Sequence, residues 1–381
     1  MKRFLGLILA LLLVIGCVPA KVHAVQMDIP AKGVLLMDVN TGTVLYEQNS
    51  HDALPIASVT KVMTMLLIME AIDSGKIGWQ DQVTASETAA AKGGSQIYLK
   101  VGETMTVADM VKSIAVSSAN DCACAMAEHI AGSETAFVEM MNAKAKALGM
   151  NDTKFVNCTG LDDAAEASEH KSSAHDVALM SRELLKNHPD ITQYTTIWMD
   201  TVRNGEFGLS NTNKLVRFYN GATGLKTGFT RAAGYCLSAS AKRDDLHLVA
   251  VVLGSETSQE RFSACKSLLD YGYANFCIVT PTAEEQIVPV KLGTADSVVA
   301  VPATTEGVLL DKSQQSLASC RVELEESVTA PVAQGQRLGT LYLQAGEQVL
   351  AEIPLLAKES VPKLTWGQIF LGLIRQLAMK G

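Results

Sequence analysis

The sequence predicts an α+β fold in which a mainly antiparallel sheet is covered by helices, followed by a small all-β domain and a C-terminal amphipathic helix. Three observations support this prediction. Paired β-type runs lie near both ends of residues 25–277 with helical patterns between them, short β-type runs recur through residues 281–358, and one apolar face runs along residues 363–381. With 381 residues, of which 48% are apolar, the chain is long enough for two packed domains.

The N-terminal residues have the composition of an export signal. Lys2-Arg3 precedes an apolar run, and Val22-His23-Ala24 fits the small-residue pattern at which signal peptides are cleaved. We therefore expect residues 1–24 to be a signal peptide and the protein to be exported. In a competing interpretation, Val14-Ile15-Gly16-Cys17 is a lipoprotein signal, and Cys17 is acylated and retained.

The charge and the cysteines exclude some classes of partner and site. A net charge of -8 argues against nucleic acid or other polyanionic partners. The chain has eight cysteines, and loss of Cys17 with the signal would leave an odd number, which cannot all pair. Their spacings do not form a metal-ligand set. We expect the remaining cysteines to be buried thiols that pack as small apolar residues.

The first domain is expected to have a β-hairpin near each end, with a helix after the second hairpin. Gly33–Asp38 and Thr43–Glu47 form the first, and Tyr235–Ala241 and Leu246–Leu253 form the second. A nearly continuous apolar run predicts a buried helix over residues 58–70. Apolar periodicity, with stop signals such as Gly149 and Pro189, predicts further helices over Val107–Ala115, Asp121–Ala131, Glu134–Leu148, Ala174–Leu185 and Gln259–Tyr271.

The second domain is predicted to be a small β-sandwich-like unit over residues 281–358. Short β-type runs follow one another at roughly ten-residue spacing, which is typical of all-β domains. The runs are Ile287–Val290, Val298–Val301, Gly307–Leu310, Cys320–Leu324 and Leu338–Leu343. None of them has a catalytic pattern, so the chemistry is expected in residues 25–277.

The C-terminal segment, residues 363–381, predicts an amphipathic helix. Its apolar face consists of Trp366, Ile369, Phe370, Leu373, Ile374 and Leu377. The helix is too short to span a bilayer comfortably, and basic residues flank it. We expect it to lie in the plane of a membrane surface, which would make the protein peripheral to the outer face of the cytoplasmic membrane. The alternative is a helix docked on the β domain or on a partner.

The first candidate for chemistry is the pair Ser58 and Lys61 at the start of the predicted helix. Three residues are close to one helical turn, so the hydroxyl and the amine are expected on the same face. A serine is a poor nucleophile until a base takes its proton, and a lysine can be that base when burial or nearby positive charge keeps it neutral. The same S-x-x-K pattern occurs at Ser168 and Ser263, where a capping serine and a surface lysine explain it more simply.

Two further motifs follow in order along the chain. Ser118-Ala119-Asn120 precedes a predicted helix, and Lys226-Thr227-Gly228 precedes the predicted strand at Tyr235. We expect Lys226 at the edge of a strand, where the missing side chain of Gly228 lets a substrate backbone approach closely. Each tripeptide alone is a common turn or cap. The three motifs together, each in a suitable context, point to one active site.

On these motifs the chain resembles the penicillin-binding serine acyltransferases, and in detail the D-alanyl-D-alanine carboxypeptidases of low molecular mass, peptidase family S11. The resemblance covers nearly the whole chain, including the β domain and the C-terminal helix, and implies a β-lactamase/penicillin-binding transpeptidase-like fold for the first domain. The family usually has Gly in the middle of the S-x-N motif, where this chain has Ala119. Further matching segments are Leu36-Met37-Asp38, Asn211-Thr212-Asn213, Gly224-Leu225 and Ala233-Gly234-Tyr235.

The resemblance implies a serine-type D-Ala-D-Ala carboxypeptidase that trims peptidoglycan stem pentapeptides and is acylated by β-lactams. Ser58 would be the nucleophile. Lys61 would be the general base, with a pKa lowered by nearby Lys226. Ser118 would hydrogen-bond between the two lysines and relay a proton to the leaving amine. No metal ion or other cofactor is implied.

The resemblance also implies substrate-binding roles. Asn120 would bind the substrate amide, and the backbone N–H groups of Ser58 and Phe229 would form the oxyanion hole. Thr227 would hold the terminal carboxylate, and Arg261 would add positive charge there. For Arg261, a surface ion pair is the simpler alternative.

Three other functions stay open on the sequence. A class A β-lactamase shares the three motifs but normally lacks a second β domain and a membrane helix. A DD-endopeptidase of the same family would cut peptidoglycan crosslinks instead of trimming stems. A non-enzymatic cell-wall scaffold would leave Ser58, Lys61 and Lys226 without a use.

Overall fold

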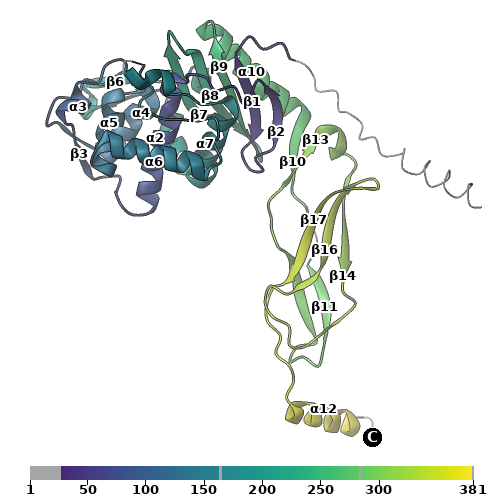
Figure 1. Ribbon diagram of the computed structural model, residues 1–381. Helices are drawn as coiled ribbons and strands as arrows, with labels where there is room; N and C mark the ends of the chain where they lie inside the picture. Colours follow the sequence, from purple (N-terminus) through teal and green to yellow (C-terminus); the bar gives the residue numbers. More distant parts are fainter. Residues whose placement is uncertain (1–26, 163–164, 283–284, 380–381) are drawn as a thin grey trace, which may run out of the picture. The chain divides into compact units, whose positions relative to one another are not determined.

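The computed structural model describes residues 27–162, 165–282 and 285–379. The predicted signal peptide and Cys17 lie outside the described residues. The first domain contains a five-stranded antiparallel sheet with the strand order β2-β1-β9-β8-β7 (Figure 1). Strands from opposite ends of the domain therefore pair with each other. The strands are β1 (Gly33–Asp38), β2 (Val44–Gln48), β7 (Ala222–Thr230), β8 (Gly234–Arg243) and β9 (Leu246–Ser255).

Helices make up most of the chain between β2 and β7. Those described in the first domain are α2 (Lys61–Asp73), α3 (Glu87–Ala90), α4 (Val107–Ser117), α5 (Asn120–Ala131), α6 (Glu134–Ala147), α7 (Ala174–Asn187), α8 (Thr192–Thr195), α9 (Leu215–Phe218) and α10 (Ser258–Asn275). Short 3-10 turns occur at η1 (Ala57–Thr60), η2 (Ala165–Glu169), η3 (Pro189–Ile191) and η4 (Arg203–Gly205). Two small ribbons pair β3 (Gln82–Thr84) with β4 (Thr104–Thr106) and β5 (Met199–Val202) with β6 (Phe207–Ser210).

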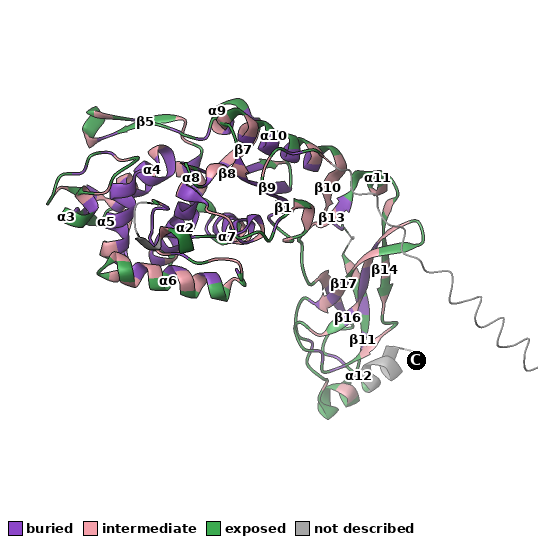
Figure 2. Ribbon diagram, turned by 45° about the horizontal axis from the view of Figure 1, so that its top comes forward, coloured by how far each residue is buried: buried purple, intermediate pink, exposed green. Residues whose placement is uncertain are grey.

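The sheet has apolar side chains on both faces. Successive residues of a strand point to opposite faces. Leu35 and Met37 of β1 belong to the core that contains α2, whereas Leu36 and Leu248 lie against Gly272 of α10. Figure 2 shows buried residues concentrated in α2, α4, α5 and the strands, while α6 keeps one exposed face. The predicted arrangement of a sheet covered by helices is confirmed.

The start of the predicted buried helix is wrong by one turn. Ser58 lies in the 3-10 turn η1, and the α-helix begins at Lys61. Ala57, directly before Ser58, has a φ of 47°, in the left-handed region, so no α-helix extends back through that residue. Sequence reasoning had no signal for this, since alanine rarely adopts that conformation.

The strand that carries Lys226-Thr227-Gly228 was not predicted as such. These residues lie inside β7, which pairs only with β8 within the described sheet and is therefore an edge strand. The expectation that Lys226 lies at the edge of a strand is corrected: Lys226 lies in the middle of strand β7. Gly224 and Gly228, close together in this segment, weaken the β pattern.

The second domain is all-β. Strands β10 (Phe276–Val279) and β13 (Val308–Asp311) form one pair. The larger sheet has the order β14-β16-β17-β12-β11-β15, with only β11 and β15 parallel among its pairs. Its strands are β11 (Gln286–Lys291), β12 (Ser297–Pro302), β14 (Ala318–Leu324), β15 (Val328–Thr329), β16 (Arg337–Ala345) and β17 (Gln348–Ala357). Helix α11 (Lys312–Gln315) follows β13.

The chain ends in helix α12 (Trp366–Met379). Trp366 and Phe370 are strongly exposed on it. Within the described residues, no helix combines the length and the apolar character that a membrane crossing requires. The predicted domain boundaries and the membrane-surface role of α12 stay predictions.

The seven described cysteines are free. Five are buried, as expected, but Cys277 is partly exposed and Cys320 is exposed. The expectation of buried thiols is therefore wrong for these two. Both lie on strands of the second domain, where alternate side chains face away from the small core.

Candidate active site

Ser58 and Lys61 meet as predicted. The ammonium nitrogen Nζ of Lys61 donates to Ser58 Oγ at 2.9 Å and to the backbone oxygen of Thr159 at 2.8 Å. Lys61 has no exposed surface, and no carboxylate in the described part of the chain forms an ion pair with it. A buried amine with only neutral acceptors is a base held ready beside a hydroxyl.

The cause of the low lysine pKa differs from the expectation. Burial lowers the pKa of Lys61 to about 7, although Cys158 and Asp121 act in the opposite direction. Burial also holds the pKa of Lys226 well below its ordinary value, and the charges of Lys61 and Arg261 lower it further. Desolvation, and not the neighbouring lysine, is therefore the main cause at Lys61, because a charged amine loses hydration that neutral acceptors do not replace.

The turn that presents Ser58 is fixed by groups on a distant loop. Gly160 has a φ of +81°, and a Cβ there would lie 1.9 Å from the backbone oxygen of Ala57. Thr60 Oγ1 donates to the same oxygen at 2.8 Å and lies 2.7 Å from His170 Nε2. His170 Nδ1 accepts from the Val156 N–H, so Nε2 carries the proton and donates to Thr60.

Gly228 is required by the chain's own backbone. A Cβ at this position would lie 2.6 Å from the backbone oxygen of Ile56 and 3.1 Å from the nitrogen of Ser58. The expectation that the missing side chain makes room for substrate is thus corrected: the space is filled by the turn η1. The K-T-G strand and the nucleophile's turn consequently lie in direct contact.

Lys226 and Thr227 are both buried on the edge strand β7. Lys226 Nζ donates to the backbone oxygen of Thr227 at 2.9 Å. Thr227 Oγ1 donates to Thr212 Oγ1 at 2.6 Å. Nearby, Asn213 Nδ2 donates to the backbone oxygen of Gly224 at 2.9 Å, which ties the preceding loop to the start of β7.

Ser118 lies at the turn between α4 and α5, two helices that pack against α2. Its backbone is in the left-handed region, with a φ of 64°, and the residue is 4% exposed. Among the described residues, its hydroxyl makes no hydrogen bond to Lys61 or Lys226. The expected bond between Ser118 and the two lysines stays a prediction.

Of the two polar atoms in the Asn120 side-chain amide, one has a hydrogen-bond partner and the other has none among the described residues. Its Nδ2 donates to the backbone oxygen of Gly93 at 2.7 Å, while the buried Oδ1 has no partner in the described part of the chain. A Cβ at Gly94 would approach Nδ2 to 2.9 Å, so that glycine leaves space for the amide. An unpaired buried acceptor costs stability and is suited to a ligand N–H.

Arg261 is not the surface ion pair that its position in the sequence allowed. It is 7% exposed, and Nη1 donates to the backbone oxygens of Gly228 and Cys236 at 3.0 and 3.3 Å. The ring of Tyr235 lies beneath its guanidinium, and Phe229, which is half exposed, stacks on Tyr235. Arg261 therefore supports the backbone of the K-T-G strand, and its buried Nε has no partner among the described groups.

Sequence reasoning missed Thr159, Gly160 and His170. The segment from 150 to 172 has no regular period, so its sequence predicts neither a helix nor a strand there. The one usable signal was Asn157 followed by Thr159 and Gly160, since Asn and Gly favour turns. Asn157 Oδ1 indeed accepts from the N–H groups of Thr159 and Gly160 at 3.1 and 2.7 Å. A loop thus supplies the acceptor for Lys61 Nζ.

Two sequence-family models match this chain. The sequence model of a family described as D-alanyl-D-alanine carboxypeptidase, peptidase S11, matches residues 20–257. A second, described as the C-terminal domain of penicillin-binding protein 5, matches residues 278–363. These two matches cover both domains in the order in which the structure has them.

Individual relatives extend over both domains as well. The chain is 44% identical over 340 residues to the D-alanyl-D-alanine carboxypeptidase DacF of Bacillus subtilis, covering 87% of this chain and 86% of that one. It is 33% identical over 345 residues to DacC of Escherichia coli, covering 88% and 85%. A solved structure of penicillin-binding protein 5 from Haemophilus influenzae is similar with a TM-score of 0.74 and 30% identity, covering 89% and 99%.

Proposed function

The chain belongs to the D-alanyl-D-alanine carboxypeptidases of peptidase family S11, and from this premise we propose that it removes the terminal D-alanine from peptidoglycan stem pentapeptides through an acyl-enzyme on Ser58. The observation that carries the proposal is the hydrogen bond of 2.9 Å between Ser58 Oγ and the fully buried Lys61 Nζ. Since burial brings the pKa of Lys61 to about 7, a large share of the amine is neutral near neutral pH.

In the proposed reaction, Ser58 is the nucleophile and Lys61 is its base. Neutral Lys61 takes the proton from Ser58 Oγ as that oxygen attacks the carbonyl carbon of the penultimate D-alanine. The tetrahedral intermediate then collapses, the peptide bond breaks, and the proton passes to the leaving amine of D-alanine with Ser118 as the relay. Water hydrolyses the ester on Ser58 and regenerates the hydroxyl.

The remaining groups hold the substrate in place. The free Oδ1 of Asn120 accepts the N–H of the substrate amide. The backbone N–H groups of Ser58 and Phe229 bind the oxyanion. Thr227 binds the terminal carboxylate, and the guanidinium of Arg261 adds positive charge there.

The test is D-alanine release from a short peptide ending in D-Ala-D-Ala. We expect Ser58→Ala to lower the rate by at least about 10⁴-fold, because the nucleophile is lost. Ser74→Ala, at an exposed position directly after helix α2, is the matched control and should keep full activity. Equal rates for the wild-type and Ser58→Ala proteins would refute the assignment.

Assays on the same protein preparation distinguish carboxypeptidase activity from endopeptidase and β-lactamase activity. Crosslinked muropeptides report endopeptidase activity, and benzylpenicillin reports β-lactamase turnover. A carboxypeptidase releases D-alanine faster than it cuts crosslinks and keeps penicillin as a stable adduct on Ser58. Rapid, repeated penicillin hydrolysis without D-alanine release would assign a β-lactamase instead.

We further propose that the protein is exported and peripheral to the outer face of the cytoplasmic membrane. The exposed apolar residues Trp366, Phe370 and Leu371 of α12 support a helix that lies on a lipid surface. The test is sedimentation with membranes. Protein truncated after Pro362 should stay in the supernatant, whereas full sedimentation of the truncated form would point to acylated Cys17 as the anchor.

A further inference from the structure

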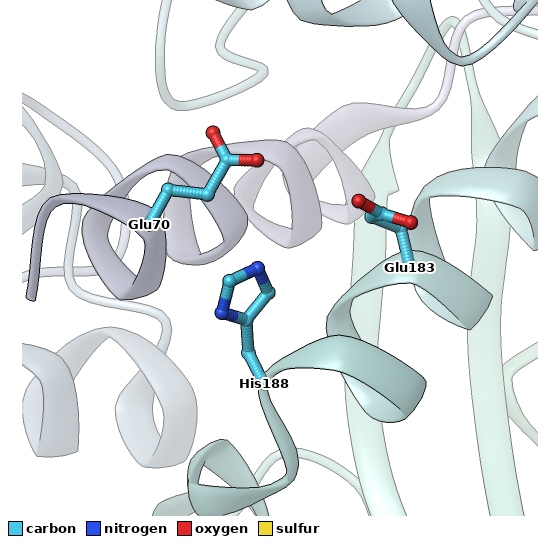
Figure 3. A group of neighbouring side chains, drawn as sticks. All are labelled: Glu70, Glu183 and His188. Carbon is cyan, nitrogen blue, oxygen red and sulfur yellow. The ribbon is translucent and has the colours of Figure 1, made fainter. Parts of the chain in front are cut away.

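A cluster of ligating side chains lies at the other end of helix α2, away from Ser58. Glu70 comes from α2, Glu183 from α7, and His188 directly follows α7. One oxygen or nitrogen of each lies within 4.8 Å of the others (Figure 3). None of these residues belongs to the S-x-x-K, S-x-N or K-T-G motifs.

The histidine is oriented as a metal ligand would be. His188 Nδ1 lies 2.5 Å from Asp73 Oδ2, which fixes the ring. The other nitrogen, Nε2, points toward the space between the two glutamates (Figure 3). His188 is 9% exposed, and Nε2 makes no hydrogen bond within the described residues. A carboxylate on one imidazole nitrogen and an open second nitrogen is the usual arrangement around a bound metal ion.

The charges of the cluster also favour a dication. Glu70, Asp73 and Glu183 bring three carboxylates, and among the described residues only the ammonium of Lys144 pairs with the glutamates, at 2.5 and 3.0 Å. With a neutral imidazole, three negative charges and one positive charge leave about -2. Glu183 Oε2 accepts from Asn187 Nδ2 at 2.8 Å, which holds that carboxylate toward the cluster.

We propose that Glu70, Glu183 and His188 bind a divalent transition-metal ion of the Zn²⁺ class, with water as a further ligand. Two carboxylate oxygens and one imidazole nitrogen are a donor set that Zn²⁺ accepts. Ligands about 2.1 Å from a tetrahedral ion lie roughly 3.4 Å apart, so the glutamates move inward and the Lys144 ammonium moves out toward solvent. The ion joins the C-terminal end of α2 to the end of α7, as a structural link remote from catalysis.

The experiment titrates Zn²⁺ into the purified full chain after chelator treatment, with calorimetry and thermal unfolding as the two measurements. One equivalent is expected to bind, and the melting temperature is expected to rise by about 5 °C once Zn²⁺ reaches 100 times its dissociation constant. His188→Gln, which keeps a donor for Asp73, should abolish both effects. His129→Gln removes an exposed histidine outside the cluster and should abolish neither.

Lys144→Gln gives the sharper test. If the ammonium and the metal ion compete for the same carboxylates, removing the ammonium should tighten Zn²⁺ binding by about tenfold or more. Circular dichroism checks that each variant folds. No binding by the wild-type and Lys144→Gln proteins, or binding that survives in His188→Gln, overturns the proposal. D-alanine release by the wild-type protein should stay within about twofold with or without Zn²⁺, so this result is independent of the proposed function.

Discussion

The two ends of helix α2 place a lysine in opposite environments. At its start, Lys61 is fully buried and contacts only a hydroxyl and a backbone oxygen, and burial lowers its pKa to about 7. Nine residues later, about 14 Å along the helix axis, Glu70 pairs with Lys144 of α6. Burial disfavours the charge of Lys144 too, but hydrogen bonds to Glu70 and Glu183 outweigh burial and raise its pKa.

The difference shows why one lysine is suited to act as a base while the other forms a structural ion pair. Lys61 is fully buried and Lys144 partly buried, but only Lys144 is paired with carboxylates. An uncompensated buried amine destabilises its charged form, and this is the property that a general base requires near neutral pH. At the active-site end of α2, the buried charged form of a lysine has no counter-ion and is unfavourable; we call this strain. The far end has no such strain, and the following variants test that contrast.

Lys61→Met should show the largest effect. The substitution keeps the volume of the side chain but removes the base, and we expect D-alanine release to fall by about 10³-fold or more. Lys144→Met, the matched substitution at the other end, should change the rate by less than about twofold. Comparable losses in both variants would mean that α2 transmits a structural defect and that Lys61 has no special chemical role.

Gly160→Ala should be the most damaging change outside the motifs. The new Cβ would fall 1.9 Å from the Ala57 oxygen, in a residue with a φ of +81°. We expect unfolding to become easier by about 3 kcal/mol, measured in urea, together with slow acylation by penicillin. Gly149→Ala isolates the backbone cost, since its φ is +75° but nothing lies within 4 Å, and it should lose only about 1 kcal/mol.

The third expected effect is on the pH dependence of acylation. Only neutral Lys61 accepts the proton of Ser58, and its pKa is about 7. The rate of penicillin acylation should therefore rise about tenfold between pH 6 and pH 8 and then level off. A flat profile over that interval would show that Lys61 is not the base, or that its environment with ligand bound compensates its charge as the glutamates do for Lys144.

The sequence predicted one end of α2 far better than the other. Ser58, Lys61, Ser118 and Lys226 were predicted because each belongs to a short motif and the three motifs follow in order along the chain. The hairpins and most helices followed from apolar periodicity. A strand such as β7, with glycine at both sides of its central Lys-Thr pair, carried no such pattern.

What the sequence could not give depends on contacts between distant segments. The backbone oxygen of Thr159 accepts a hydrogen bond from Lys61, which is 98 residues away in the sequence. No local sequence pattern predicts such a backbone acceptor. Gly228 was assigned to substrate access, whereas the neighbour that needs its space is the turn at Ile56. The cluster of Glu70, Glu183 and His188 was not detected either, because its ligands come from two helices whose packing only the folded chain defines.

The smallest expected effect is on stability, and it should have opposite signs at the two ends of α2. Lys61→Met replaces an uncompensated buried amine by an apolar side chain of similar size, so the melting temperature should stay unchanged or rise by about 3 °C. Lys144→Met leaves Glu70 and Glu183 without their cation and should lower it by a similar amount. The measurement is thermal unfolding without added metal, followed by circular dichroism. Destabilisation by Lys61→Met as large as that by Lys144→Met would mean that the hydrogen bonds to Ser58 and Thr159 already compensate the buried amine, and that the strain assigned to the active-site end is absent.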